Sequence, residues 1–167
     1  PWTVEVTLND GGRQTLTTRA IVIAAGARPF VPLLPGLAEV DPVTSDTLWE
    51  RFAARDEMPR RLVVLGGGPI GCELAQAFAR LGAQVTQVEM APRLMLREDE
   101  EVSAFVRDAL TADGVQVLTG HKALRCAREG GRKTLVVERD GTELKIEFDE
   151  LICAVGRVRM TRRLWEL

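Results

Sequence analysis

The sequence predicts an α/β fold in which helices cover a parallel sheet and an antiparallel β-meander follows. Apolar strand-like runs alternate with amphipathic segments between residues 61 and 118, which is typical of successive βαβ units. Between residues 122 and 148, Gly-Gly and Asp-Gly pairs join three β-rich runs, which is typical of antiparallel hairpins. A further apolar run at 150–155 predicts one more buried strand.

The first 57 residues are predicted to hold two strands, an irregular connection and one short helix. Four prolines between residues 28 and 43 mark the connection as a boundary between structural units. The expected elements are strands at 3–8 and 14–25 around a turn at 9–12, and a helix at 46–54 with Ser45 as its N-cap.

The central region is predicted to alternate between strands and helices. The strand at 61–65 is apolar throughout, as expected for a parallel strand that is buried on both faces. Gly82 and Gly114 follow the two helices and are expected to end them. The expected strands are 61–65, 84–89, 115–118, 122–128, 133–139 and 143–148, and the expected helices are 69–81 and 99–113, the second with Val102, Phe105, Val106 and Leu110 inward.

Composition and charge exclude several classes of partner. The 167 residues carry a formal net charge of −2, so no basic field attracts nucleic acid or an anionic membrane. No apolar run approaches the roughly 20 residues that span a bilayer. The three cysteines stand far apart and lack metal-ligand spacing, so we expect no metal site and a reduced, cytoplasmic setting.

Glycines interrupt the chain between the strand at 61–65 and the helix that follows. In the pattern Gly66-x-Gly68-x-x-Gly71, each glycine has a physical purpose in a dinucleotide-binding βαβ unit. Gly66 permits the tight turn, Gly68 lets the backbone approach a pyrophosphate, and Gly71 lets the helix pack closely on the strand. The pattern predicts a Rossmann-type nucleotide site.

The helix after the glycines is expected to help bind an anion. Its first N–H groups have no intrahelical partner, and the helix dipole is positive at this end. Pro69 gives up an N–H that would be unpaired in any case.

Glu89 ends the second strand of this unit, about 20 residues after the glycines, where the fold places an acid. A carboxylate there accepts hydrogen bonds from the adenosine ribose hydroxyls and repels a 2′-phosphate. No arginine follows Glu89 before Arg93. The sequence therefore favours NAD(H) over NADP(H); the alternative is that Glu89 is a solvated strand end.

Three segments together resemble the pyridine nucleotide-disulfide oxidoreductase family. "IVIAAGARPFVP" at 21–32 resembles the ATG-type segment that closes the first FAD-binding stretch of these enzymes. "VVLGGGPIGCELAQAFARLGAQVTQVEMAPRLM" at 63–95 resembles their central NAD(P)-binding domain. "DELICAVGR" at 149–157 resembles the strand and turn that return to the FAD domain. Within the family, the chain is most similar to mercuric reductase-like and dihydrolipoamide dehydrogenase-like flavoproteins.

The resemblance implies roles for particular residues. Glu89 would hold the adenosine ribose, Ala123 would lie near the adenine, and Gly156 would offer its backbone near the nicotinamide. Glu73 matches a family glutamate that pairs with a lysine beside the flavin; the alternative is an exposed first-turn glutamate favoured by the helix dipole. The pyrophosphate would be lined by Gly66, Gly67, Gly68, Pro69, Ile70 and Gly71.

The resemblance also implies a reaction and a domain plan. NAD(P)H would pass a hydride to FAD, and the flavin would reduce a cysteine pair. The family's FAD glycine motif, its CxxxxC pair and its C-terminal interface domain with the His-Glu couple are absent from these 167 residues. We expect a partial FAD-domain segment and linker at 1–57, the NAD(H)-binding domain at 58–157 and a stub of the return into the FAD domain at 158–167. The whole protein is expected to be a homodimer, and this piece alone to be inactive.

Two other functions stay open from the residues alone. One is a stand-alone, non-catalytic module that senses nucleotides. The other is a Rossmann-type dehydrogenase with its own substrate site, which would need a general acid or base near the nicotinamide. The chain has no Tyr and a single histidine, His121. The terminal substrate is also open between mercuric ion, lipoamide and another thiol or acceptor.

The remaining reactive residues are expected to be structural. His121 is predicted to be a polar residue at the start of the meander, and the acidic run at 97–101 the first turn of a helix. Cys72 is expected to pack as a small side chain, with a lowered thiol pKa at the helix start as the alternative. Cys126 and Cys153 fall in strands and are expected to be buried.

Overall fold

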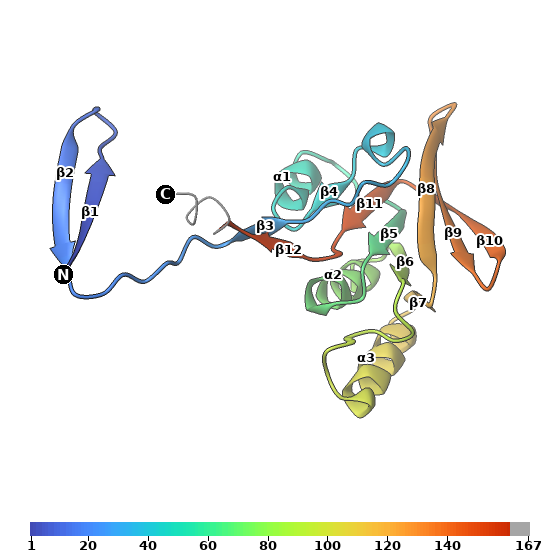
Figure 1. The fold of residues 1–167 in the computed structure, drawn as a ribbon. Helices are drawn as coiled ribbons and strands as arrows, with labels where there is room; N and C mark the ends of the chain where they lie inside the picture. The colour runs from blue at the N-terminus through green and yellow to red at the C-terminus, as the bar shows by residue number, and fades with distance from the viewer. Residues whose placement is uncertain (161–167) are drawn as a thin grey trace. The chain divides into compact units, whose positions relative to one another are not determined.

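The computed structural model describes residues 1–160, which divide into two compact units (Figure 1). Unit 1 holds residues 1–27 and resumes at Arg159, and unit 2 holds residues 28–158. Most of the C-terminal stub expected at 158–167 lies outside the described residues. The domain boundaries expected near residues 57 and 157 stay predictions.

Unit 1 is a hairpin of β1 (Trp2–Thr7) and β2 (Arg13–Thr18), which pair antiparallel as the sequence predicts. The prediction that the second strand continues to residue 25 was wrong, because the chain leaves the ladder after Thr18. Val22 is 89% exposed. No strand among the described residues pairs with this apolar run. Its high β propensity is therefore not sufficient to make it a strand.

Unit 2 is built on a five-stranded parallel sheet, which confirms the predicted fold class. Among these five strands, the last one along the chain lies between the first two and pairs with both of them. The order of the strands in the sheet therefore differs from their order in the sequence. The order is β4 (Val43–Thr44), β11 (Glu150–Cys153), β5 (Arg61–Leu65), β6 (Gln84–Glu89) and β7 (Gln116–Thr119).

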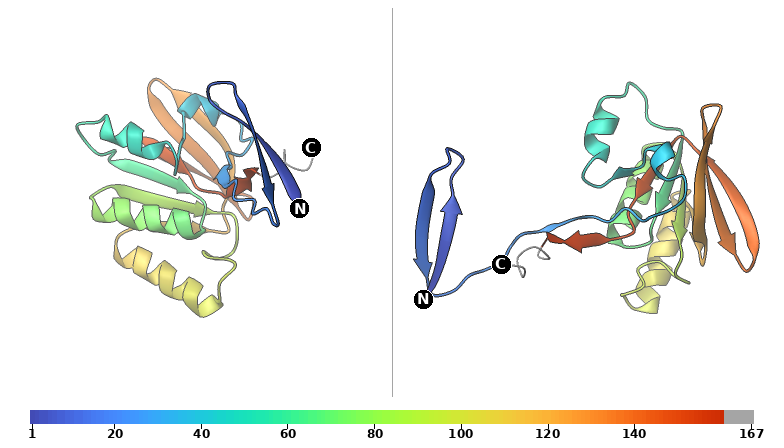
Figure 2. Two further views of the ribbon diagram at one scale, coloured as in Figure 1. Left: turned by 90° about the vertical axis from the view of Figure 1, so that its left-hand side faces the viewer. Right: turned by 45° about the horizontal axis from the view of Figure 1, so that its top comes forward.

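Helices cover one face of this sheet. Leu62 and Val64 of β5 pack there with Leu74 and Phe78 in one apolar cluster. Figure 2 shows these helices and the strands of the meander on opposite sides of the sheet. The helices are α1 (Leu48–Ala53), α2 (Pro69–Arg80) and α3 (Glu100–Ala112), with a 3₁₀ turn at Ala38–Val40 before α1.

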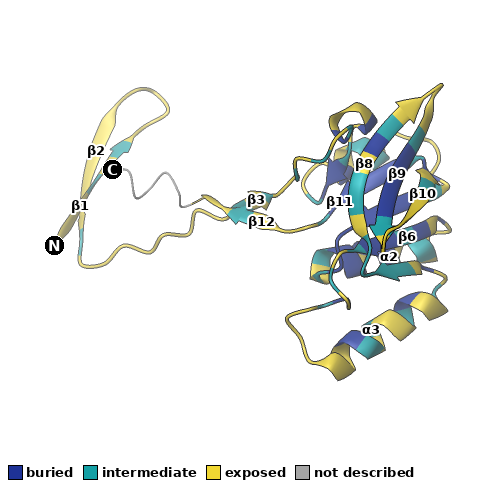
Figure 3. Ribbon diagram, turned by 45° about the vertical axis from the view of Figure 1, so that its right-hand side comes forward, coloured by how far each residue is buried: buried dark blue, intermediate teal, exposed yellow. Residues whose placement is uncertain are grey.

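The three-stranded meander covers the opposite face. Val63 and Leu65, the alternate residues of β5, pack with Leu135, Val137 and Phe148 in a second cluster. Figure 3 shows the buried positions gathered in the strands of unit 2, while β1 and β2 are mostly exposed. The meander consists of β8 (Lys122–Glu129), β9 (Arg132–Arg139) and β10 (Thr142–Phe148), in the order β10-β9-β8.

A short ribbon that the sequence did not predict joins β3 (Ala27–Pro29) to β12 (Arg157–Arg159). Within unit 2, the N–H of Phe30 donates to the carbonyl oxygen of Gly156 at 2.9 Å. The segment after residue 27 is therefore held beside the chain that leaves β11.

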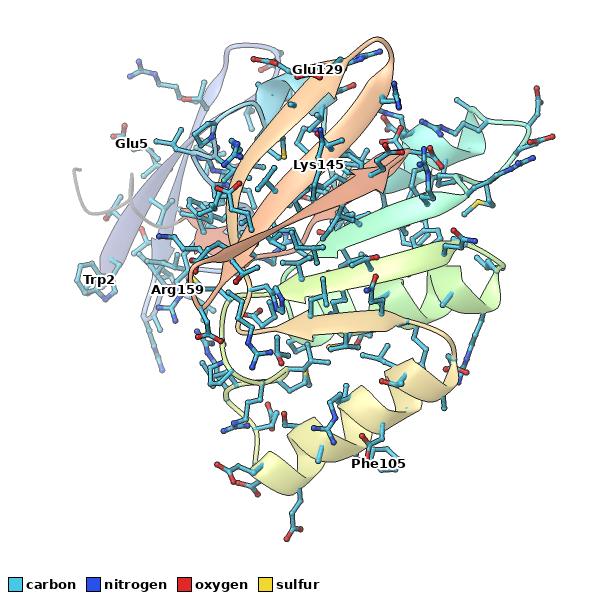
Figure 4. The ribbon with its side chains drawn as sticks, turned by 90° about the vertical axis from the view of Figure 1, so that its right-hand side faces the viewer. Trp2, Glu5, Phe105, Glu129, Lys145 and Arg159 are labelled. Carbon is cyan, nitrogen blue, oxygen red and sulfur yellow. The ribbon has the colours of Figure 1, made fainter. Side chains whose placement is uncertain are left out.

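Two predictions about the helices were wrong. The N-cap of α1 is Thr47 rather than Ser45, and its hydroxyl accepts from the N–H of Thr44 in a turn. On α3, Val102 and Phe105 are exposed, and Figure 4 shows Phe105 projecting away from the sheet. Leu110 is buried and Val106 packs against the core, as predicted, and the helix also buries Ser103, whose hydroxyl donates to the Leu94 carbonyl at 2.7 Å.

We predict that Phe148→Ala lowers the free energy of unfolding by about 3–5 kcal/mol, because Phe148 is fully buried between the meander and the sheet. The matched control is Phe105→Ala, which removes a side chain that is 75% exposed and should cost less than about 0.5 kcal/mol. Urea unfolding of both variants measures the difference. Equal costs would show that the meander does not pack on the sheet as described.

Candidate functional site

The candidate site lies where β5 and β6 end, at the carboxyl edge of the parallel sheet. The chain turns from β5 into α2 through the glycines, and the N–H of Gly66 still donates to the Val88 carbonyl at 2.8 Å. In open α/β sheets, ligands bind in the crevice outside this edge. The fold therefore presents the glycine turn where a nucleotide is expected.

Three of the four glycines are required by the protein's own packing. Gly66 has φ +118°, and a Cβ there would lie 2.4 Å from the carbonyl oxygen of Ala154. A Cβ on Gly67 would lie 2.8 Å from Cγ of Glu89, and a Cβ on Gly71 would lie 2.2 Å from the carbonyl oxygen of Gly66. These glycines allow the turn and the close approach of α2, whether or not a ligand binds.

Gly68 differs from the other three. Its backbone is extended, with φ −80° and ψ −178°, a conformation that any residue adopts. A Cβ there would meet no atom of the described residues within 4 Å. The packing and backbone conformation of the described residues therefore do not require a glycine at position 68.

The first amides of α2 face this open side without acceptors. Gly68 is the N-cap and makes no side-chain cap, and Pro69 stands at the first position of the helix. The first intrahelical bond comes from the N–H of Cys72 to the Gly68 carbonyl at 3.0 Å. No acceptor for the amides of Gly68, Ile70 or Gly71 is found within residues 1–160. Such a helix start is suited to bind an anion.

Glu89 turns its carboxylate toward the glycine turn. Its Oε2 accepts from the N–H of Gly67 at 2.6 Å, and its Oε1 accepts from the N–H of Ala91 at 2.7 Å. The residue is half-buried, so it is not a solvated strand end pointing away. A carboxylate offers about four lone-pair positions. Two of them stay available for hydroxyl donors on the open side.

A hollow of about 290 Å³ lies beside the loop that follows β6. It is bordered by the loop, by the first turns of α3 and by Thr119, which pairs with Glu89 in the sheet. Its two arginines already have partners. Arg93 donates to the Glu98 carbonyl at 2.7 Å, and Arg107 pairs with Asp108 at 2.8 Å.

The meander begins beside Glu89. The N–H of His121 donates to the Glu89 carbonyl at 3.0 Å, and the N–H of Gly120 donates to the Ala91 carbonyl at 2.8 Å. Ala123 follows in β8 and is half-buried. Its expected place near the adenine stays a prediction.

Gly156 follows β11, and Glu73 lies on α2 after the glycine turn. Gly156 is exposed after β11, and the N–H of Ala154 before it donates to the Leu65 carbonyl at 2.8 Å. Glu73 is exposed on α2, beyond the first turn, and no lysine within residues 1–160 pairs with it. The nicotinamide and flavin roles of these residues stay predictions.

The three cysteines are free and buried, as expected. Burial raises the pKa of the Cys72 thiol, although a hydrogen bond with Gln87 opposes the shift. The alternative of a lowered thiol pKa is therefore wrong. Burial also raises the pKa of Cys153, and that of Cys126 to about 11. The cytoplasmic setting stays a prediction.

Among residues 1–160, we find no second cluster of reactive side chains. Nδ1 of His121 lies 2.8 Å from the Thr119 carbonyl, which gives the ring a local partner. Within residues 1–160, no three His, Cys, Asp or Glu side chains come together as metal ligands. No helix in that range is long and apolar enough to cross a membrane.

Sequence reasoning missed Gln87. This side chain is fully buried in β6, and its Nε2 donates to the Gly66 carbonyl at 3.0 Å. The available signal was a glutamine inside a strand whose neighbours Val85 and Val88 are core residues.

Comparisons with known proteins agree with one another. The family model described as "Pyridine nucleotide-disulphide oxidoreductase" matches residues 2–166. The mercuric reductase of Bacillus cereus is 39% identical over 153 residues, covering 92% of this chain and 24% of that protein. The dihydrolipoyl dehydrogenase of Rhizobium etli is 38% identical over 151 residues, covering 89% of this chain and 30% of that protein.

Solved structures of reductases are also similar to this chain. The HOCl-induced flavoprotein disulfide reductase RclA of Escherichia coli superposes with a TM-score of 0.71 at 28% identity, covering 95% of this chain and 34% of that one. The ferredoxin reductase for the CYP199A2 system of Rhodopseudomonas palustris gives 0.77 at 27% identity, covering 97% and 40%. The chain thus spans about a quarter to two fifths of the length of these similar proteins.

We predict that Gly71→Ala destabilises the chain by about 2–4 kcal/mol, because its Cβ would overlap the Gly66 carbonyl oxygen. Gly68→Ala is the matched control and should change the free energy of unfolding by less than about 1 kcal/mol, because its Cβ enters open space. Thermal and urea unfolding measure both variants. A larger cost at Gly68 than at Gly71 would contradict the geometry of the turn.

We predict that the folded chain reacts slowly with a thiol reagent at pH 8. A pKa of about 11 leaves Cys126 with about a hundredfold less thiolate than an ordinary cysteine of pKa 9.0, and burial also blocks access. Reaction with Ellman's reagent should accelerate as the pH rises toward 11 and should become fast at pH 8 in urea. Rapid labelling of the folded chain at pH 8 would contradict the burial of the thiols.

Proposed function

Because the chain belongs to the pyridine nucleotide-disulphide oxidoreductase family, we propose that residues 58–157 bind NAD(H) for an FAD-dependent oxidoreductase. In the whole protein, the hydride of NADH would reach FAD and then a cysteine pair. The flavin core, the cysteine pair and the interface domain of a homodimer would come from outside these 167 residues. The terminal acceptor, whether mercuric ion, lipoamide or another thiol, would be bound there as well.

The open backbone at Gly68 is the observation that carries the proposal. Three glycines are explained by packing, and the fourth leaves space next to three amides without acceptors. A pyrophosphate fills such a space, because its oxygens accept from amides and approach a backbone that has no Cβ. The residues present therefore fit the diphosphate of a dinucleotide.

The preference for NAD(H) rests on Glu89. Its carboxylate lies beside the turn with acceptor capacity left for the ribose hydroxyls, and its negative charge opposes a 2′-phosphate. Arg93, the first arginine after it, donates to the carbonyl oxygen of Glu98 instead of facing the turn. The charges beside the ribose position thus favour the unphosphorylated sugar.

The other residues would act at the two ends of the cofactor. Ala123 in β8 would pack near the adenine, since the backbone before it is bonded to the Glu89 strand end. Gly156 would offer backbone near the nicotinamide, and Glu73 would face the flavin. NADH would supply the hydride when bound, and these residues would orient the cofactor without taking part in the bond changes.

We predict that calorimetry of the 167-residue chain detects NADH in the micromolar to millimolar range and NADPH at least tenfold more weakly. Gly68→Val should abolish binding of both, because its side chain fills the diphosphate position while its backbone conformation suits a β-branched residue. Equal affinity for NADH and NADPH would contradict the proposed preference for NAD(H). No affinity for either would contradict the site.

We predict that Glu89→Gln weakens NADH binding by about tenfold, or about 1.4 kcal/mol, and narrows the difference between NADH and NADPH. The charge that opposes a 2′-phosphate is lost, and an amide cannot accept from both Gly67 and Ala91 through two oxygens. Glu101→Gln on the exposed face of α3 is the control and should leave both affinities unchanged. If Glu101→Gln also weakened NADH binding, the effect of Glu89→Gln would reflect the lost charge in general and not a contact between Glu89 and the ribose.

A further inference from the structure

Gln87 is a buried polar side chain in β6, whose other fully buried residues, Val85 and Val88, are apolar. It is 0% exposed, and its Oε1 has no hydrogen-bond partner within residues 1–160. A buried amide oxygen without a donor costs free energy that an apolar side chain of similar size would avoid. Packing of the sheet alone does not account for a glutamine at this position.

The amide nitrogen of Gln87 holds the inner side of the glycine turn. Nε2 donates to the carbonyl oxygen of Gly66 at 3.0 Å and lies 3.5 Å from Sγ of Cys72. The same nitrogen would be 3.3 Å from a Cβ on Gly71. Gln87 therefore fills the place where the turn, the start of α2 and strand β6 meet.

The peptide plane between Gly66 and Gly67 is held at both edges. In a trans peptide, the carbonyl oxygen and the N–H point in opposite directions, and the described chain has no cis peptide bond. Gln87 bonds the carbonyl at one edge, and Glu89 accepts from the N–H of Gly67 at the other edge, at 2.6 Å. The two residues stand two apart on β6, so their side chains leave the same face of the strand.

The next peptide plane is fixed by the loop after β6. The carbonyl oxygen of Gly67 accepts from the N–H of Met95 at 2.7 Å. The N–H of Gly68, which belongs to the same peptide plane, must then point away from Met95. That amide has no acceptor within residues 1–160, and Gly68 is the one glycine among the four of the turn whose Cβ position is open.

From this geometry we propose that Gln87 is a positioning residue that sets the glycine turn in its dinucleotide-binding conformation. The inference rests on the proposed function. Gln87 touches no part of the ligand, and it acts through the Gly66 carbonyl. By fixing the first peptide plane, it aims the amides of Gly68 and the start of α2 before the nucleotide arrives, which lowers the cost of ordering them on binding.

The test compares Gln87→Met with the wild-type chain. Met has a similar volume and is compatible with a buried strand, but it cannot donate to Gly66. We expect the Kd for NADH and for NADPH to rise five- to tenfold each, with their ratio unchanged, since the diphosphate is common to both. We also expect amide hydrogen exchange at Gly67, followed by NMR without nucleotide, to accelerate at least tenfold while β9 amides keep their rates.

The matched control is Thr86→Val, which removes a polar group from the neighbouring position of β6. The Thr86 hydroxyl donates to Gln116 and not to the turn. We expect wild-type affinities and wild-type exchange at Gly67. Gln87→Asn, whose amide is one methylene too short to reach Gly66, should behave like Gln87→Met and replaces it if that variant does not fold.

The outcomes separate this inference from the proposed function. If the wild-type chain binds NADH, and Gln87→Met has the same affinity and the same exchange rate at Gly67, the proposed role of Gln87 is wrong. The proposed function is not affected by that result. A wild-type chain that binds no nucleotide would contradict the proposed function. In that case, exchange at Gly67 still decides whether Gln87 sets the turn, because that measurement needs no ligand.

Discussion

The candidate site at the carboxyl ends of β5 and β6 depends on the contact between the Gly66 carbonyl and the first turn of α2. No Cβ fits at Gly71, because it would lie 2.2 Å from that oxygen. The close approach brings the amino end of the helix against the end of β5, so its unpaired amides open onto the crevice. The same carbonyl accepts from Gln87, so one backbone group sets both the helix position and the plane of the turn.

The two edges of the sheet differ in how their polar groups are satisfied. At the edge where β5 begins, Arg61 donates to Asp149 at 2.8 Å, and this hydrogen bond lowers the pKa of the Asp149 carboxyl. Nearby, the buried Glu150 pairs with Arg55 and lies 3.6 Å from Lys133. Ion pairs thus form at one end of the sheet, where Oε2 of the buried Glu150 lacks a hydrogen-bond partner within residues 1–160, while the end with the glycine turn has several backbone amides without acceptors. Under the proposed function, this asymmetry would favour binding of an anionic ligand at a single end of the sheet.

Two layers, the helices and the meander, cover the two faces of the sheet that carries the candidate site. Alternate residues of β5 pack into separate clusters, Leu62 and Val64 on the helix side and Val63 and Leu65 on the meander side. The meander does more than cover the sheet, because its first residues are bonded to the backbone at Glu89 and Ala91. The antiparallel appendage therefore fixes the strand end that presents the carboxylate, which links the packing of the meander to the proposed ribose site.

The sequence alone determined the parallel sheet, the meander and the glycine turn, because their signals are local: apolar period, turn glycines and helix ends. It also placed Glu89 at the turn through chain spacing. Only the tertiary structure decided which glycines the protein needs for itself, since a missing Cβ has meaning only against atoms that lie far away in sequence, such as Ala154. The burial of Ser103 on α3 and the role of Gln87 were likewise decided by partners, Leu94 and Gly66, that no local pattern identifies. Periodicity uses only the residues of the helix itself, whereas these hydrogen bonds depend on residues that the fold brings close together.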